Sequence, residues 1–153
     1  MATQEVLTAN DVERQLIRIR ENFQRHQHEV LTKFGITATD LEVLLFIYQE
    51  GPGRMKDIGD RFHIKFSSLT SLVDRLQKLR LVKRTLSKED RRAVLVHLLR
   101  KGNQLIEEYN SQVKSLAEKI SATVPSKELP VFVNTLEKVS APHPQPKELS
   151  FEE

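Results

Sequence analysis

Cysteine is absent from this chain of 153 residues. Its absence excludes disulfides, thiolate zinc sites and thiol-based redox sensing. Long apolar runs are also missing: no stretch has the length needed to span a bilayer, and Met1–Asn10 lacks the apolar run of a signal peptide. We therefore expect a single domain with its own core, in a cytoplasmic protein that makes no use of a membrane.

Catalytic motifs are missing as well. The sequence contains no G-x-S-x-G elbow, no kinase motif set and no metalloprotease helix motif. The turn Gly51–Gly53 is not followed by the Gly-Lys-Ser/Thr of a phosphate-binding loop. His26 and His28 are two positions apart on a predicted helix, so they point in different directions and make a poor metal pair. We predict that the chain is not an enzyme and holds no metal or cofactor.

Positive charge is concentrated in one part of the chain, although the net charge is only +3. The segment from Arg54 to Lys101 contains 14 lysines and arginines and 5 acidic residues, whereas the remainder contains 10 and 16. Such segregation is typical of a surface that binds a polyanion, because neutralised phosphates release their counterions. A basic, solvated face without a partner is the alternative.

The segment from Leu79 to Gly102 predicts a basic β-hairpin. Apolar runs at Leu81–Leu86 and Ala93–Leu98 flank a charged connection of six residues, Ser87–Arg92. Taken alone, such a hairpin is also compatible with a solvated turn. At its tip, however, a guanidinium can enter a narrow minor groove. The cations at or beside the tip are Lys88, Arg91 and Arg92.

Two predicted helices, Met55–Phe62 and Phe66–Arg80, come directly before this hairpin. A helix-turn-helix followed by a basic hairpin is the winged form of a DNA-binding unit, in which the second helix enters the major groove. Apolar residues of that second helix recur on one face, at Leu69, Leu72, Val73, Leu76 and Leu79. The opposite arc carries our candidate DNA contacts Ser67, Ser68, Thr70 and Ser71.

This arc lacks Arg, Asn and Gln in its first two turns, the residue types that make bidentate contacts to bases. We expect modest direct readout, with specificity that depends on groove shape and on the hairpin. Phosphates are expected to be held by Lys65, Arg75, Lys78 and Arg84. For Arg75, an intramolecular ion pair with Asp74 is the alternative.

Three segments together resemble the MarR family of bacterial and archaeal transcription regulators: Leu72–Leu76, Leu81–Arg84 and the run from Asp90 through Leu98 to Gly102. The resemblance covers about residues 10 to 140. It implies that Asp90 holds one arginine of the hairpin in place while Arg91 or Arg92 contacts DNA. It also implies helices of two interleaved chains, with a cavity where small organic effectors loosen DNA binding.

Departures from the family pattern concentrate around the second helix. Arg80 stands where many members have Gly, so a left-handed C-cap is predicted to be strained or replaced. His63 also stands where Gly is frequent, Lys65 where a Ser or similar cap is usual, and Ser71 where a basic residue is common. These differences bear on the operator sequence and the affinity.

Long helices are predicted on both sides of the winged unit. Asn10–Lys33 carries a stripe of Val12, Leu16, Ile19, Phe23 and Val30, with Asn10 or Asp11 as cap and Gly35 as end. At about 36 Å this helix is too long to pack only against its own domain. Two further helices are predicted at Asn103–Thr123 and, with Ser126 as cap and Pro130 in its first turn, at Ser126–Val139.

The expected fold is mainly α with a small β-hairpin wing. It consists of a winged helix-turn-helix at residues 37–101, a helical dimerisation region at 10–35 and 103–140, and a mobile tail at 141–153. The expected function is that of a homodimeric repressor, bound to a palindromic operator in double-stranded DNA and relieved by a small organic effector. Two alternatives remain: a winged-helix dimer that binds a protein partner, and a protein whose primary function is to bind a small ligand.

Overall fold

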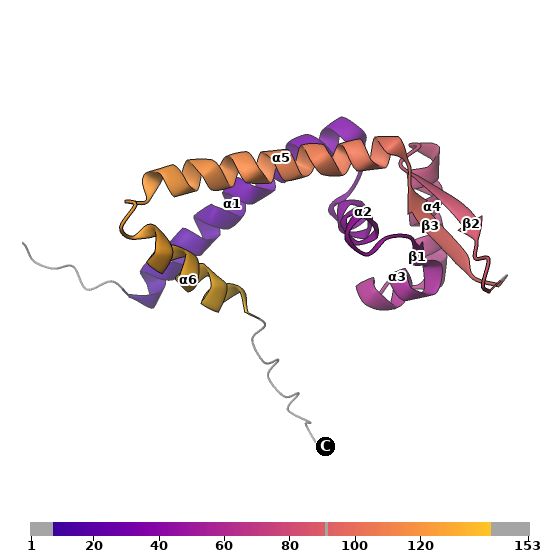
Figure 1. The fold of residues 1–153 in the computed structure, drawn as a ribbon, viewed down its shortest axis with the longest axis horizontal. Helices are drawn as coiled ribbons and strands as arrows, with labels where there is room; N and C mark the ends of the chain where they lie inside the picture. Colours follow the sequence, from indigo (N-terminus) through magenta and orange to yellow (C-terminus); the bar gives the residue numbers. More distant parts are fainter. Residues whose placement is uncertain (1–7, 91, 142–153) are drawn as a thin grey trace, which may run out of the picture. The chain divides into compact units, whose positions relative to one another are not determined.

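The computed structural model describes residues 8–90 and 92–141. These residues form two compact units, one ending at Lys114 and the other starting at Ser115, and each is described by itself. No helix in the described residues combines the length and apolar character needed to cross a membrane. In chain order (Figure 1), the elements are α1 (Ala9–Phe34), α2 (Ala38–Glu50), β1 (Gly53–Arg54), α3 (Met55–Phe62), α4 (Phe66–Lys78), β2 (Val82–Leu86), β3 (Val94–Leu98), α5 (Arg100–Thr123) and α6 (Leu129–Ser140).

Capping residues fix where the first two helices begin. For α1 the predicted caps, Asn10 and Asp11, were wrong: Thr8 is the N-cap, and its N–H and hydroxyl both donate to an Asp11 carboxylate oxygen at 2.9 Å. These two hydrogen bonds lower the pKa of Asp11. The predicted end at Gly35 is confirmed by its φ of 67°. Thr37 caps α2, since its hydroxyl oxygen accepts from the N–H of Asp40 at 3.2 Å.

The core lies where α2, α3, α4 and the sheet come together in the first unit (Figure 1). Phe46 and Phe62 add an edge-to-face ring contact at a centroid distance of 5.7 Å. Tyr48, on α2, is 44% exposed and lies outside this core. The fully enclosed residues include Leu41, Leu44, Ile58, Leu69, Leu76, Leu81 and Leu105.

The predicted hairpin is confirmed. β2 and β3 pair antiparallel in a register that runs from Val82 opposite Leu98 to Leu86 opposite Val94. A third strand, β1, pairs with the other edge of β3, which gives the order β1-β3-β2. A strand of two residues carries no periodic pattern from which the sequence could predict it.

Two residues other than glycine adopt left-handed backbone at the ends of α3 and α4. His63 follows α3 with a φ of 52°, and Arg80 lies just beyond α4 with a φ of 60°. The chain therefore keeps the geometry that glycine usually provides and accepts the strain of a side chain there.

Helix α5 begins at Arg100, three residues before its predicted start, so that Gly102 lies inside the helix and not before it. Gly102 is required by a close approach: a Cβ at this position would lie 2.3 Å from the carbonyl oxygen of Leu81. The same carbonyl accepts from the N–H of Leu99 at 2.9 Å. The start of α5 is thereby packed against the chain that leaves α4.

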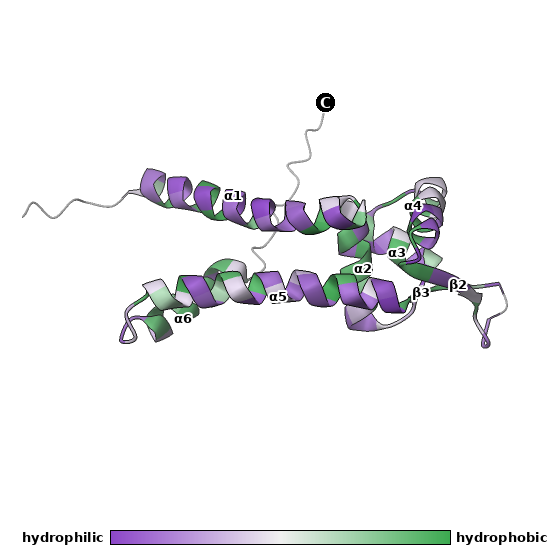
Figure 2. Ribbon diagram, turned by 90° about the horizontal axis from the view of Figure 1, so that it is seen from above, coloured by the Kyte–Doolittle hydropathy of each residue, from purple (hydrophilic) through white to green (hydrophobic). Residues whose placement is uncertain are grey.

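Helix α6 belongs to the second unit. It begins at Leu129, and the predicted start with Ser126 as cap was wrong, because Pro125–Glu128 forms a turn in which the Glu128 N–H donates to the Pro125 carbonyl at 2.8 Å. Pro130 lies in the first turn as predicted. No residue from Leu129 to Ser140 is buried, although Figure 2 shows much of this helix as apolar.

Candidate nucleic-acid interface

Helix α4 places the predicted contact residues on one outward face. Its apolar side, formed by Leu69, Leu72, Val73 and Leu76, is buried in the core. The opposite side leaves Ser67, Ser68, Ser71 and Lys78 exposed and Thr70 half-buried. The helix therefore has the amphipathic form that a recognition helix needs.

Two hydroxyls on this face are already engaged as donors. The Thr70 hydroxyl donates to the Phe66 carbonyl at 2.9 Å, and the Ser71 hydroxyl donates to the Ser67 carbonyl at 3.2 Å. Each oxygen keeps its capacity to accept a hydrogen bond. In this arrangement both groups are available as acceptors rather than donors.

Arg75 forms an ion pair, but not with the neighbour that the sequence indicated. Its Nη2 donates to both carboxylate oxygens of Asp40, at 2.5 and 2.7 Å, whereas Asp74 pairs elsewhere. Asp40 is fully buried and also accepts from the N–H of Thr37 at 2.8 Å. Its carboxylate therefore joins the N-terminus of α2 to α4.

Arg84 connects strand β2 to helix α4 through two contacts. Its Nη1 pairs with Asp74, and its Nη2 donates to the Thr70 carbonyl at 3.0 Å. Two of the four cations predicted to hold phosphates, Arg75 and Arg84, thus make intramolecular contacts. Such contacts position α4 and β2 relative to each other.

The exposed cation set consists of the predicted contact residues whose charge is not engaged in this way. All four lie at the surface, and among residues 8–90 and 92–141 their side chains form no ion pair or hydrogen bond. The set is Lys65, Lys78, Lys88 and Arg92.

The connection between β2 and β3 is ordered by short-range hydrogen bonds. The buried Ser87 hydroxyl oxygen accepts from the N–H groups of Glu89 and Asp90, at 3.2 and 3.3 Å. An Asp90 carboxylate oxygen accepts from the Arg92 N–H at 3.0 Å. Asp90 therefore orients the wing (β2, β3 and their connection) through the main chain of Arg92. Arg91 lies outside the described residues.

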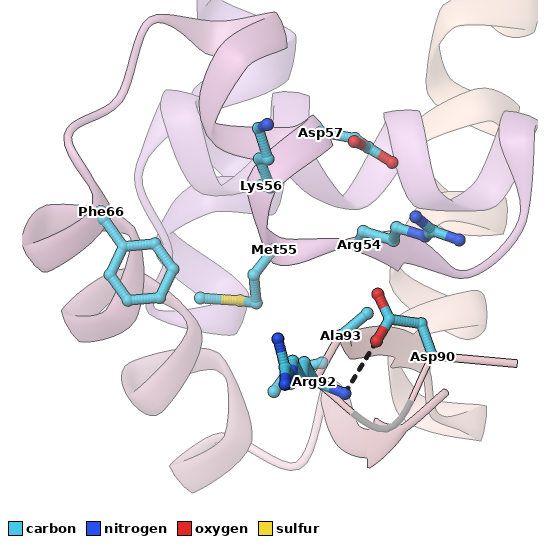
Figure 3. Close-up of a pocket in the computed structure, with 9 residues that line it drawn as sticks. Arg54, Met55, Lys56, Asp57, Phe66, Asp90, Arg92 and Ala93 are labelled. Carbon is cyan, nitrogen blue, oxygen red and sulfur yellow. Dashed lines mark hydrogen bonds between the residues drawn. The ribbon is translucent and has the colours of Figure 1, made fainter. Parts of the chain in front are cut away.

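A cavity of about 350 Å³ lies where the wing meets the helix-turn-helix. Figure 3 shows the side chains that surround it, from β1, from the start of α3, from the first residue of α4 and from the wing. Arg92 and Phe66 both line it. The wing and the beginning of α4 therefore share one surface. The remaining lining residues are Arg54, Met55, Lys56, Asp57, Asp90, Ala93 and Val94.

Sequence reasoning missed three features of this surface. Asp40 was not connected with Arg75, although the spacing of Thr37 and Asp40 is that of a capping box. Ser87 was treated only as part of a charged connection. Arg54 and Lys56 were not considered as neighbours of the wing, because only the pairing of β1 with β3 brings them there.

His26 and His28 contact different turns of α1. His26 Nδ1 lies 2.8 Å from the Asn22 carbonyl oxygen, and His28 Nε2 lies 3.4 Å from the Thr32 hydroxyl oxygen. The partner of His26 lies one turn toward the N-terminus of the helix, and the partner of His28 lies one turn toward its C-terminus. The rings are thus directed apart, as the spacing predicted.

Comparison with known proteins relates this chain to one family of regulators. A family model described as MarR family matches residues 34–93. The uncharacterized HTH-type transcriptional regulator YsmB of Bacillus subtilis (strain 168) is 27% identical over 129 residues, 84% of this chain and 88% of YsmB.

Solved structures share the fold. The transcriptional regulator Tm0710 from Thermotoga maritima is 29% identical with a TM-score of 0.69, covering 85% of this chain and 92% of that one. The S. aureus MepR–DNA complex has a TM-score of 0.70 at 19% identity, covering 80% of this chain and 92% of MepR. At that identity the second likeness is one of fold alone.

Proposed function

Because this chain belongs to the MarR family of transcription regulators, we propose that it is a homodimeric repressor of a palindromic operator in double-stranded DNA, relieved by a small organic effector. In this proposal α4 enters the major groove and the wing reaches an adjacent minor groove. The observation that carries it is the exposed cation set, which lies on α4 and the wing of one unit.

Phosphate contact is the sequence-independent part of this proposal. Lys65 and Lys78 lie at the two ends of α4, and Lys88 and Arg92 lie on the wing. Cations spaced in this way can contact the DNA phosphates on either side of the groove that the helix enters. MepR, which shares this fold, has been solved in complex with DNA, and this supports DNA binding by the present chain.

Dimerisation is supported by apolar side chains that the described chain leaves exposed. On α1, Val12, Leu16, Ile19 and Phe23 are 59%, 52%, 46% and 41% exposed at spacings of three and four residues. A continuous stripe of this kind is typical of a helix that packs against a second chain. On α6, the exposed apolar residues are Val131, Val133, Leu136 and Val139.

A two-fold dimer relates the operator to the protein. Symmetry gives two copies of α4, which bind half-sites about 34 Å apart when they lie one helical turn of DNA apart. The operator is then an inverted repeat. We also propose a cytoplasmic location, because a repressor must reach chromosomal DNA.

Release by an effector rests on the family resemblance. Its test is a panel of small aromatic acids, phenols and amines added to the protein–DNA complex. A compound that dissociates the complex without unfolding the protein supports this part of the proposal. If every compound leaves the affinity unchanged, DNA binding stands without this mode of control.

The deciding experiment is the retardation of genomic DNA fragments by the purified protein at 50 to 200 mM salt. A dimer that makes 6 to 10 phosphate contacts loses about 10³- to 10⁵-fold in affinity over this range. Absence of binding at the lowest salt contradicts the proposal and leaves a protein partner as the alternative. Transcription from a bound promoter with and without the protein then distinguishes a repressor from an activator.

A further inference from the structure

The recognition helix begins with an aromatic residue that the core does not use. Phe66 is 68% exposed, whereas Leu69, Val73 and Leu76 of the same helix are fully buried. Its position at the first residue of α4 is where a helix-turn-helix protein brings side chains to base edges.

The neighbours of Phe66 offer few other means of reading a base. From Phe66 to Asp74 the helix has no Arg, Asn or Gln, and these residue types make the bidentate contacts to guanine and adenine. The hydroxyls of Thr70 and Ser71 donate to the helix backbone. The first turns therefore offer no bidentate contact to a base, and the groups that can meet base edges there are small hydroxyls and the Phe66 ring.

Charges of the proposed DNA-binding surface lie beside this ring. Phe66 lines the cavity of about 350 Å³ together with Arg92 of the wing and Lys56 of α3 (Figure 3). Lys65, which is exposed, precedes it directly in the chain. A duplex held by these cations brings its groove to the ring.

One base edge in the major groove offers an apolar group. Thymine carries a 5-methyl group there, and a phenylalanine side chain is one of the groups that contact it. We propose that Phe66 is a specificity-determining residue that packs against the methyl group of a thymine in each operator half-site. This inference rests on the proposed function and adds the base that the helix selects.

The test replaces thymine by deoxyuridine, which removes the methyl group and leaves the hydrogen-bonding edge unchanged. Duplexes are first selected from random-sequence DNA with the wild-type protein. Each thymine of a selected duplex is then replaced in turn, and Kd is measured by fluorescence anisotropy. At one position per half-site, loss of the methyl group is expected to raise Kd about fourfold.

Two variants assign the effect to the ring. Phe66→Ala is expected to bind the thymine and deoxyuridine duplexes with equal Kd. Tyr48→Ala is the matched control, because it removes an aromatic side chain that is 44% exposed on α2, outside α4 and the wing, and it is expected to keep the wild-type discrimination. Circular dichroism checks that both variants are folded. If Phe66→Ala is not folded, the comparison of thymine and deoxyuridine duplexes with the wild-type protein is the deciding measurement.

The outcomes separate this inference from the proposed function. If every deoxyuridine duplex binds as tightly as its parent, or if Phe66→Ala discriminates as the wild type does, the role of Phe66 is overturned while DNA binding stands. If the wild-type protein selects no duplex, the proposed function fails and this inference fails with it.

Discussion

Arg75 on α4 reaches across to Asp40 on α2 and donates from one nitrogen to both of its carboxylate oxygens, at 2.5 and 2.7 Å. The two partners are unequally exposed: Asp40 is fully buried, whereas the Arg75 side chain is 47% exposed. Removal of one partner therefore differs in cost from removal of the other.

Arg75→Met is expected to lower the free energy of unfolding by about 2 to 3 kcal/mol, because it leaves a buried carboxylate with the Thr37 N–H as its remaining partner. Asp40→Asn is expected to cost about 1 kcal/mol, because the amide oxygen still accepts from Thr37 and water solvates the released guanidinium. Urea unfolding at one fixed protein concentration measures both values.

The double variant Asp40→Asn/Arg75→Met is the control for this pair. It removes the buried charge together with its partner, so it is expected to be more stable than Arg75→Met alone. A cost for Asp40→Asn equal to or above that of Arg75→Met would contradict the asymmetry.

Gly102→Ala tests the close approach between α5 and the chain after α4. Replacing glycine by alanine in a helix interior normally raises the free energy of unfolding by about 1 kcal/mol. Here the new Cβ would lie 2.3 Å from the Leu81 carbonyl oxygen, so we expect a loss of about 2 kcal/mol or more in the free energy of unfolding. Thermal and urea unfolding measure the change.

Asn110→Ala is the matched control on the same helix. Asn110 is exposed, and its replacement is expected to leave stability unchanged or to raise it slightly. The close approach would be refuted if both alanine variants gained stability to the same extent.

Arg80→Gly and His63→Gly are expected to raise stability. Both residues have a positive φ, which costs a side-chain-bearing residue about 1 to 2 kcal/mol, while glycine loses more conformational freedom on folding. The net gain is expected to be up to about 1 kcal/mol for each substitution. Unfolding midpoints at or below the wild-type value would show that these turns are not strained.

The wing cations are expected to provide DNA affinity without contributing to the fold. Arg91→Gln/Arg92→Gln should weaken operator binding about 10-fold or more and reduce the salt slope by about 1 per chain, because the wing arginine that contacts DNA is lost. Dimer size and helicity should stay as in the wild type. Fluorescence anisotropy over a salt series gives both quantities.

Arg20→Gln/Arg25→Gln is the matched control, since it removes the same charge from exposed positions on α1. This variant is expected to keep most of the operator affinity. Equal losses in the two double variants would mean that net charge, and not the wing, governs binding.

Dimerisation is expected to depend on the exposed stripe of α1. Leu16→Glu/Phe23→Glu places two charges where apolar side chains are 52% and 41% exposed, so burial against a second chain becomes costly. We expect monomers in sedimentation experiments and loss of operator binding. Gln24→Glu, at an exposed position of the same helix, should remain dimeric. A dimeric stripe variant would place the interface elsewhere.

Prediction from the sequence succeeded where local patterns have a single structural solution. The apolar runs Leu81–Leu86 and Ala93–Leu98 predicted the hairpin, and the period of Leu69 to Leu76 predicted which face of α4 is buried. The helix boundaries were less accurate. Helix α1, capped by Thr8, and helix α5, which starts at Arg100, both begin before the residues at which periodicity placed them, because the first residues of a helix lie outside its apolar pattern.

The sequence by itself determined the winged helix-turn-helix, its charge distribution and its outward serine-rich arc, because each depends on residues that are close together in the chain. Only the tertiary structure decided which cations remain exposed. Arg75 pairs with Asp40, which lies 35 positions away in the sequence, and Arg84 on β2 pairs with Asp74 on α4. Those pairings follow from how α2, α4 and β2 pack, and spacing along the chain carries no information on contacts between separate elements.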